Sequence, residues 1–362
     1  MALDYCNVVA STDPDVFFKA IQLKEKLGFD DEFIVNLYSI QAEYTEDVPE
    51  VDKATSSIKS LFWRGDHIFA DSNYEWALTE CKKYGTAASY VTLVYYANSH
   101  YKYDADKLYE LMCGIDKLEK DGRTVHYDYY LTELMKPLQN HFMNDPVKAH
   151  ELAEIEIAYF PLLEWENMRC FQEEIKRTPE IYAELASIIY KKDSNDNSSL
   201  KTKEQQDYVN ILYRLFYMAH FCPAEKNGVV DRAELENWII QFKELLTAND
   251  QSSLFGYLLG RLWAYAPHGK DGYPPCEAVR EIIQQYADDS MISEYRVAVY
   301  NQRGVYFASA GRNERTIAER HKETADHLRL QYPKTAEVFD GLYRTYKREA
   351  EIERREAENG QF

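Results

Sequence analysis

Long apolar runs, paired cysteines and a leading signal region are all missing from this chain of 362 residues. No stretch approaches the roughly 18 apolar residues that a membrane-spanning helix needs, and the N-terminus lacks a basic region followed by an apolar run. The cysteines include no C-x-x-C pair, which argues against a zinc module or a dense disulfide framework: they stand at positions 6, 81, 113, 170, 222 and 276. We therefore expect a soluble cytoplasmic protein with reduced thiols and no membrane partner.

Positive charge is also scarce. The chain has 42 Lys and Arg residues against 61 Asp and Glu residues, which gives a formal charge of -19. This balance repels phosphate backbones unless basic groups cluster, so direct nucleic-acid binding is disfavoured. Neither a G-x-x-x-x-G-K-S/T motif nor a strand-linked G-x-G-x-x-G motif is present, and we expect no cofactor.

Signals for β-strands are nearly absent, because no two alternating runs flank an Asn-Gly or Gly-Gly turn. Helical periodicity, by contrast, covers most of the chain. The first helix is marked at both ends, with Asp13 as N-cap, Pro14 at its first position and Gly28 as a left-handed stop. Further helices are predicted near residues 30–44, 51–62, 72–84, 86–99, 104–119, 127–142, 145–160, 162–176, 179–191, 204–221, 232–246, 252–265, 274–287, 293–311, 314–332 and 334–358.

This succession predicts an all-α fold. We expect stacked antiparallel helix pairs, forming an α-solenoid of the tetratricopeptide or HEAT kind with irregular repeats, and a large irregular bundle is the competing arrangement. The polar stretch 192–202 is the expected linker between an N-terminal helical half, 1–191, and a C-terminal helical half, 203–358, which ends in a charged helix.

One helix pair resembles a tetratricopeptide repeat, in which small residues let two helices approach closely. The resemblance rests on small, aromatic and turn residues in the order of that family: Gly304, Phe307, Gly311, Ala318, Ala325 and Pro333. The first Ala comes about two residues late for the family's 34-residue spacing, and no upstream segment repeats the set. The resemblance implies a helical hairpin at 293–331.

The stretch "PAEKNGVVDRAEL" (223–235) shares several positions with the calcium loop of an EF-hand. Asn227, Asp231 and Glu234 fall where that loop has ligands, but Pro223 stands where its first carboxylate should be. The same residues also fit a helix entrance, with Gly228 at positive φ, Asp231 as N-cap and Glu234 completing a capping box. We expect no metal here, and a calcium site using Asn227, Asp231 and Glu234 is the weaker alternative.

No catalytic residue can be assigned, because the nine histidines form no H-E-x-x-H motif and no pair four residues apart. Trp and Arg residues are the candidates for partner binding, since these types dominate interface hot spots. The candidates are Trp63, Arg64, Trp165, Trp238, Arg261, Trp263 and Arg303. The competing interpretation is core packing or cation–π contacts between helices.

Several segments, among them "LAEIEIAYFPLLE", "TPEIYAELASIIY" and "YKREAEIERREAE", resemble the C-terminal helical region of large, uncharacterised bacterial proteins. The resemblance covers about residues 152 to 358, and in this chain that region is not joined to a much larger N-terminal part. It implies a bacterial protein associated with phage-defence or toxin–antitoxin genes, and it carries over no catalytic residues.

Taken together, these patterns predict a scaffold or sensor arm that binds another protein, encoded nearby, through a surface of aromatic and Arg anchors. An excess of negative charge favours a basic partner. The alternatives are an enzyme with an unrecognised active site and a calcium-responsive regulator built on residues 223–234. Oligomeric state stays open.

Overall fold

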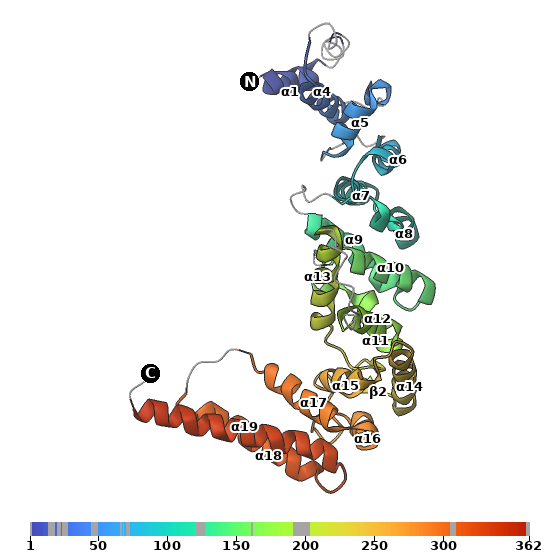
Figure 1. The fold of residues 1–362 in the computed structure, drawn as a ribbon. Coiled ribbons are helices and arrows are strands. Elements are labelled where there is room, and N and C mark those ends of the chain that lie inside the picture. The colour runs from blue at the N-terminus through green and yellow to red at the C-terminus, as the bar shows by residue number, and fades with distance from the viewer. Residues whose placement is uncertain are drawn as a thin grey trace. The chain divides into compact units, whose positions relative to one another are not determined.

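The computed structural model describes residues 2–13, 28–44, 50–65, 73–120, 127–160, 162–190, 203–304 and 309–359, with positions 19, 23, 67 and 69. Within these ranges it contains seventeen α-helices and one two-stranded hairpin (Figure 1). The prediction of an all-α protein is therefore confirmed. Contacts divide the chain into two compact units, Met1–Phe171 (unit 1) and Gln172–Phe362 (unit 2).

The predicted linker, 192–202, lies outside the described residues. The division by contacts falls earlier in the chain, between Phe171 and Gln172, and the predicted halves 1–191 and 203–358 stay a prediction. Most of the first predicted helix also lies outside the described residues. Its expected stop, Gly28, has the left-handed φ of 68° that the sequence predicted.

Unit 1 is a series of short helices in which neighbours along the chain pack on one another. Its elements are α1 (Ala2–Thr12), α4 (Asp31–Tyr44), η1 (Glu50–Lys53), α5 (Ser56–Trp63), α6 (Tyr74–Tyr84), α7 (Ala87–Tyr101), α8 (Ala105–Met112), η3 (Ile115–Lys117), α9 (Tyr127–Phe142), α10 (Pro146–Ala158) and η4 (Trp165–Asn167). Contacts link α1 to α4, α4 to α5, α5 to α6 and α6 to α7, and then α7 and α8 to α9 and α9 to α10. The core of unit 1 therefore extends from helix to helix along the sequence.

Local sequence explains where these helices begin and end. Thr86 and Ser89 form a capping box at the start of α7, because each side chain binds the other's backbone amide. On α9, Leu131, Leu134 and Leu138 are fully buried, and this spacing gives the helix one apolar face. The helix predicted at 104–119 is split by Gly114, whose φ of 81° separates α8 from η3.

Unit 2 contains short helices together with the longest helix that the structure describes. After α11 (Arg169–Arg177), which begins just before the division, come α12 (Glu180–Ile189), α13 (Lys203–Met218), β1 (Glu225–Lys226), β2 (Val229–Val230), α14 (Arg232–Ala248), η5 (Ser252–Leu254), α15 (Phe255–Trp263), α16 (Glu277–Tyr286), α17 (Asp289–Asn301), α18 (Arg312–Leu328) and α19 (Pro333–Glu358). Helix α12 contacts α13 and α14, α14 contacts α16, α15 contacts α17, and α19 contacts α16, α17 and α18.

Two glycines four residues apart on α15, Gly256 and Gly260, predict close helix packing, and the structure confirms this. A Cβ atom at Gly260 would lie 2.6 Å from the carbonyl oxygen of Met291 on α17. In the stretch that resembles a tetratricopeptide repeat, Ala318 and Ala325 are buried on α18. However, α18 packs chiefly on α19, and α17 on α15 and α19, so the hairpin at 293–331 stays a prediction.

The expectation of almost no strand overlooked one short hairpin. Glu225 pairs with Val230 and Lys226 with Val229, around a turn at Asn227 and Gly228. Both turn residues have positive φ, 52° and 79°, as a two-residue hairpin turn requires. The Asn-Gly signal was present, but strands of two residues are too short to show alternation. Among the helices that the structure describes, none combines the length and apolar character needed to cross a membrane.

Candidate functional site

The four tryptophans predicted as partner anchors lie in the core. Their exposed fractions run from 1% to 8%, for Trp63, Trp165, Trp238 and Trp263. The indole N–H of Trp238 donates to the carbonyl oxygen of Ile175 at 3.3 Å, and that of Trp263 lies 3.3 Å from the sulfur of Met291. Buried indoles with a partner for the N–H stabilise a core. In this structure these side chains pack helices together and present no ring to a partner.

The three arginines among the candidates differ in their surroundings. Arg64 forms a 2.5 Å ion pair with Glu119. The guanidinium of Arg261, on α15, lies over the rings of Phe216 and Tyr217 on α13, at 4.8 and 4.6 Å from their centroids. Within the described residues Arg261 makes these two ring contacts and no ion pair. Its positive charge lies over aromatic rings, and it also opposes the burial that raises the pKa of the Glu294 carboxyl.

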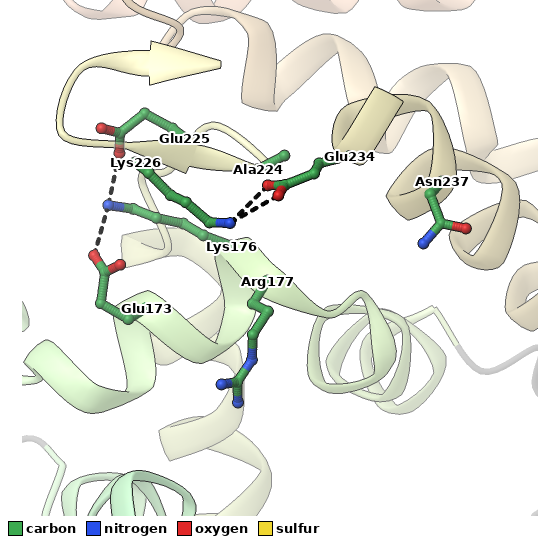
Figure 2. A pocket seen from close by; sticks show the side chains of 8 residues that line it. All are labelled: Glu173, Lys176, Arg177, Ala224, Glu225, Lys226, Glu234 and Asn237. Atoms are coloured by element: carbon green, nitrogen blue, oxygen red, sulfur yellow. Dashed lines mark hydrogen bonds and ion pairs between the residues drawn. The ribbon is translucent and has the colours of Figure 1, made fainter. Parts of the chain in front are cut away.

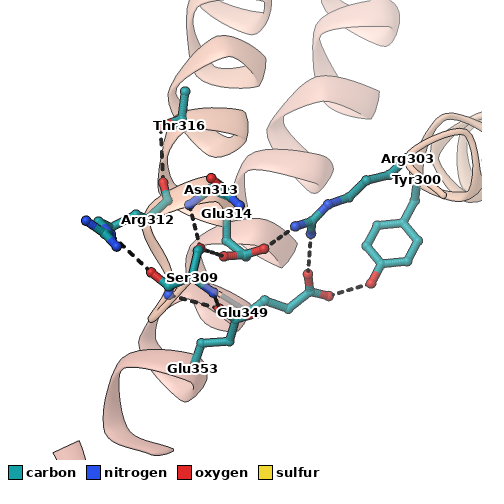
Figure 3. A network of polar contacts seen from close by, with 10 residues as sticks. Tyr300, Arg303, Ser309, Arg312, Asn313, Glu314, Thr316, Glu349 and Glu353 are labelled. Atoms are coloured by element: carbon teal, nitrogen blue, oxygen red, sulfur yellow. Dashed lines mark hydrogen bonds and ion pairs between the residues drawn. The ribbon is translucent and has the colours of Figure 1, made fainter. Parts of the chain in front are cut away.

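Arg303 belongs to a polar network that joins the segment before α18 to α19 (Figure 3). It pairs with Glu314, which is fully buried, and lies 3.8 Å from Glu349. The Ser309 hydroxyl donates to Glu314 at 3.2 Å, and the Ser309 amide donates to Glu353 at 3.2 Å. Burial alone would raise the pKa of Glu314, but the Arg303 guanidinium and the Ser309 hydroxyl hold it below its ordinary value. These contacts hold the segment before α18 against α19, so we interpret the network as structural.

The stretch that resembles a calcium loop is a helix entrance joined to a hairpin (Figure 2). Asp231 Oδ1 accepts hydrogen bonds of 2.9 Å from the amides of Ala233 and Glu234, so the predicted N-cap is confirmed. Glu234 does not reach back to complete a capping box. Its carboxylate accepts a 2.7 Å bond from Lys226 Nζ across the hairpin.

The cavity beside this hairpin is about 170 Å³ in volume, and most of the charged side chains that line it are paired with one another. Lys176 Nζ lies 3.0 Å from Glu173 and 2.7 Å from Glu225, as the dashed lines in Figure 2 show. Nowhere in the described parts of the chain do three or more His, Cys, Asp or Glu side chains gather as metal ligands would. Asn227, Asp231 and Glu234 are thus placed as turn, cap and ion-pair residues.

Four tyrosines from two neighbouring helices of unit 1 form an aromatic surface. Tyr95 and Tyr96 lie on α7, and Tyr129 and Tyr130 lie on α9. The rings of Tyr95 and Tyr130 are stacked with centroids 4.4 Å apart, and Tyr129 lies 6.0 Å from Tyr95. The hydroxyls of Tyr96 and Tyr130 are 3.3 Å apart. We call these four residues the tyrosine surface.

The tyrosine surface is open to solvent. Tyr129 is 51% exposed, and the other three rings are half-buried. Tyr129 points outward because α9 turns Leu131, Leu134 and Leu138 toward the core, and Tyr129 lies on the opposite side of the helix. A hydrogen bond with Tyr129 raises the pKa of the Tyr95 hydroxyl.

The unit that carries the tyrosine surface has an excess of negative charge. Unit 1 has 30 Asp and Glu residues against 16 Lys and Arg residues, so it carries -14 of the chain's formal charge of -19. Asp128, next to Tyr129, is exposed. The faces of aromatic rings attract cations through their quadrupole. The arrangement suits lysine and arginine side chains.

Sequence reasoning named none of these tyrosines. The signal was the total of 30 Tyr residues and the doublets Tyr95-Tyr96 and Tyr129-Tyr130. Adjacent residues on a helix point in different directions, so each doublet places at least one ring away from the core. Only the structure shows that the two doublets, 34 residues apart in the sequence, contact each other. No family model, curated protein or solved structure matches this chain.

Proposed function

We propose that this chain is a protein-interaction scaffold whose tyrosine surface binds a basic segment of another protein. The observation that carries the proposal is the exposed stack of Tyr95, Tyr129 and Tyr130 in a unit with a large excess of acidic residues. Aromatic rings in contact with Arg or Lys give hot spots at interfaces. The acidic field of unit 1 raises the rate of encounter with a basic partner.

The helix order in unit 1 supports a scaffold of the solenoid kind. Consecutive helices contact one another from α1 to α7 and again from α7 to α10, which is the contact pattern of stacked helical repeats. All six cysteines are free thiols, which supports a role in the cytoplasm, where disulfides are rare. Within this proposal the bacterial and phage-defence setting rests on the sequence resemblance alone.

Peptide binding tests the role of the tyrosine surface. A fluorescent Arg-Ser repeat peptide is the probe, a Gln-Ser repeat peptide is its neutral control, and anisotropy is measured with the full chain at two salt concentrations. The expected result is saturable binding of the Arg-Ser peptide that weakens as salt screens the charges. The Gln-Ser peptide should not bind.

Matched variants locate the binding. Tyr129→Leu removes a ring that is 51% exposed, and Tyr213→Leu, on α13 of unit 2, removes one that is 48% exposed. Tyr129→Leu should weaken binding of the Arg-Ser peptide about fivefold, because an exposed cation–π contact contributes about 1 kcal/mol. Tyr129→Phe, which keeps the ring, and Tyr213→Leu should leave it unchanged. Equal losses for Tyr129→Leu and Tyr213→Leu would show that the tyrosine surface is not the site.

A further inference from the structure

The tyrosine surface contains two phenols from different helices whose hydroxyl ends converge. Tyr96 lies on α7 and Tyr130 lies on α9, and their ring centroids are 5.9 Å apart. Their hydroxyl oxygens are only 3.3 Å apart. Because the oxygens are closer together than the ring centres, the two rings lean toward each other at their hydroxyl ends. The ortho carbons, which flank the hydroxyl-bearing carbon of each ring, therefore lie on the converging halves of the rings.

Further phenol rings surround this pair. Tyr95 stacks on Tyr130 with centroids 4.4 Å apart, and Tyr129 lies 5.8 Å from Tyr130. Tyr129 is 51% exposed, and the other three rings are half-buried. An oxidant in solution can therefore reach the tyrosine surface, and an electron vacancy formed on one ring has neighbouring phenols to which it can pass.

Two adjacent phenols couple when one-electron oxidants act on them. Each phenol loses one electron and one proton and becomes a phenoxyl radical, whose unpaired spin lies partly on the ortho carbons. A bond then forms between an ortho carbon of each ring, and the hydrogen on each of these carbons moves to the oxygen of its own ring. Both phenols are restored. The two electrons and two protons that have left the pair reduce one molecule of hydrogen peroxide to two of water, through a haem peroxidase.

The fold holds Tyr96 and Tyr130 at close range. Helix α7 packs on α9, which keeps the two residues opposite each other. Side chains at a surface reorient within picoseconds to nanoseconds, so the rings can make the small movement that brings two ortho carbons to bonding distance. Reacting groups held together in this way behave as partners in an intramolecular reaction, which favours their coupling over coupling between two molecules.

We propose that Tyr96 and Tyr130 form a site of oxidative modification, at which an oxidant of the haem peroxidase class joins α7 to α9 by a carbon–carbon bond. The two residues are 34 positions apart in the sequence. The bond therefore closes a loop of the chain and restricts the unfolded state, as a disulfide does. The oxidised chain should resist unfolding better than the unmodified one. This inference does not depend on peptide binding by the tyrosine surface.

The test treats the full chain with hydrogen peroxide and a catalytic amount of a haem peroxidase. The expected product is a monomer that has lost the mass of two hydrogen atoms and shows the blue fluorescence of dityrosine. After digestion with trypsin, mass spectrometry should find the peptide that contains Tyr96 joined to the peptide that contains Tyr130. Fragmentation of the joined peptides should locate the bond at these two residues. The melting temperature of the product should exceed that of the untreated chain.

Conservative variants identify the reacting residues. Tyr96→Phe and Tyr130→Phe each keep a ring but remove its hydroxyl, so no phenoxyl radical forms there, and each should abolish the joined peptides. Tyr213→Phe is the matched control, because Tyr213 is 48% exposed and lies 4.4 Å from Tyr217 in unit 2. It should leave the bond between α7 and α9 unchanged. A circular dichroism spectrum like that of the wild type verifies that each variant is folded.

Binding of the Arg-Ser peptide separates this inference from the proposed function. Tyr96→Phe keeps every ring of the tyrosine surface, so it should leave peptide binding unchanged while it prevents the cross-link. Three results would overturn the inference. One is a treated monomer without joined peptides, with dityrosine found only in dimers. Another is a bond located at Tyr95 and Tyr129 in place of Tyr96 and Tyr130. The third is a yield of joined peptides that Tyr96→Phe leaves unaltered.

Discussion

The carboxylate of Glu156, on α10, accepts a 2.7 Å hydrogen bond from the backbone amide of Phe171, in the first turn of α11. It also accepts bonds from the Cys170 amide and the Gln139 side chain. Glu156 is fully buried. The Glu156 carboxylate of α10 thus accepts hydrogen bonds from backbone amides in the first turn of α11, which have no partner within their own helix.

This carboxylate makes stability depend on pH. Burial raises the pKa of Glu156 to about 7 from 4.5, and its three hydrogen bonds only partly oppose the rise. Because the folded-state pKa lies above the unfolded one, the group's stabilising contribution is present at low pH and is lost as pH rises toward 7. The difference corresponds to about 3 kcal/mol.

Glu156→Gln should remove this dependence. Between pH 5 and pH 8 the free energy of unfolding of the wild type should fall by up to about 3 kcal/mol relative to that of the variant, since the amide cannot ionise. Urea unfolding at both pH values measures the difference. Parallel pH profiles for the two proteins would show that Glu156 is not the titrating group.

Arg303 and Glu314 form a buried ion pair, with side chains 11% and 0% exposed. Arg303→Met should lower the free energy of unfolding by about 3 kcal/mol, because it leaves the Glu314 charge buried without its partner. The double variant Arg303→Met/Glu314→Gln should recover part of that loss. A double-mutant cycle at pH 7 gives the coupling, and strictly additive losses would contradict the pairing.

The loop at 223–234 should not respond to calcium. Titration calorimetry with millimolar calcium should give no heat, and the melting temperature should not move. Asp231→Ala should lower the free energy of unfolding by about 1 kcal/mol, because it removes the N-cap of α14. Glu234→Gln should change the free energy of unfolding by less than about 0.5 kcal/mol, because the ion pair of Glu234 with Lys226 is exposed. Saturable heat that both substitutions abolish would restore the EF-hand interpretation.

Caps and periodicity predicted the helices well where a single helix has its own start and stop. The helix expected at 127–142 is α9, and the one at 334–358 begins one residue earlier as α19. The expectation at 162–176 was wrong in part, because the chain forms η4 and then starts α11 at Arg169. Short 3₁₀ turns leave no periodic signature over three residues.

The candidate sites were harder to predict, for a physical reason. Trp238 and Trp263 are the residue types that suit both an interface and a core, and only the packing of α14 and α15 decides between them. Arg261 was named from the sequence, but its missing counter-ion depends on where α13 and α17 lie. The tyrosine surface forms because α7 packs on α9, although α8 and η3 separate these two helices in the sequence.

The turn at Asn227 and Gly228 also affects how readily this asparagine deamidates. Asparagine followed by glycine converts to aspartate when the glycine nitrogen attacks the asparagine side-chain carbonyl and closes a five-membered imide. Here that nitrogen donates a 2.6 Å hydrogen bond to Glu225, which Lys176 holds in place. The fold therefore restrains the nucleophile at the position where spontaneous deamidation would otherwise be fastest, and stored protein should keep this asparagine longer than a free peptide of the same sequence.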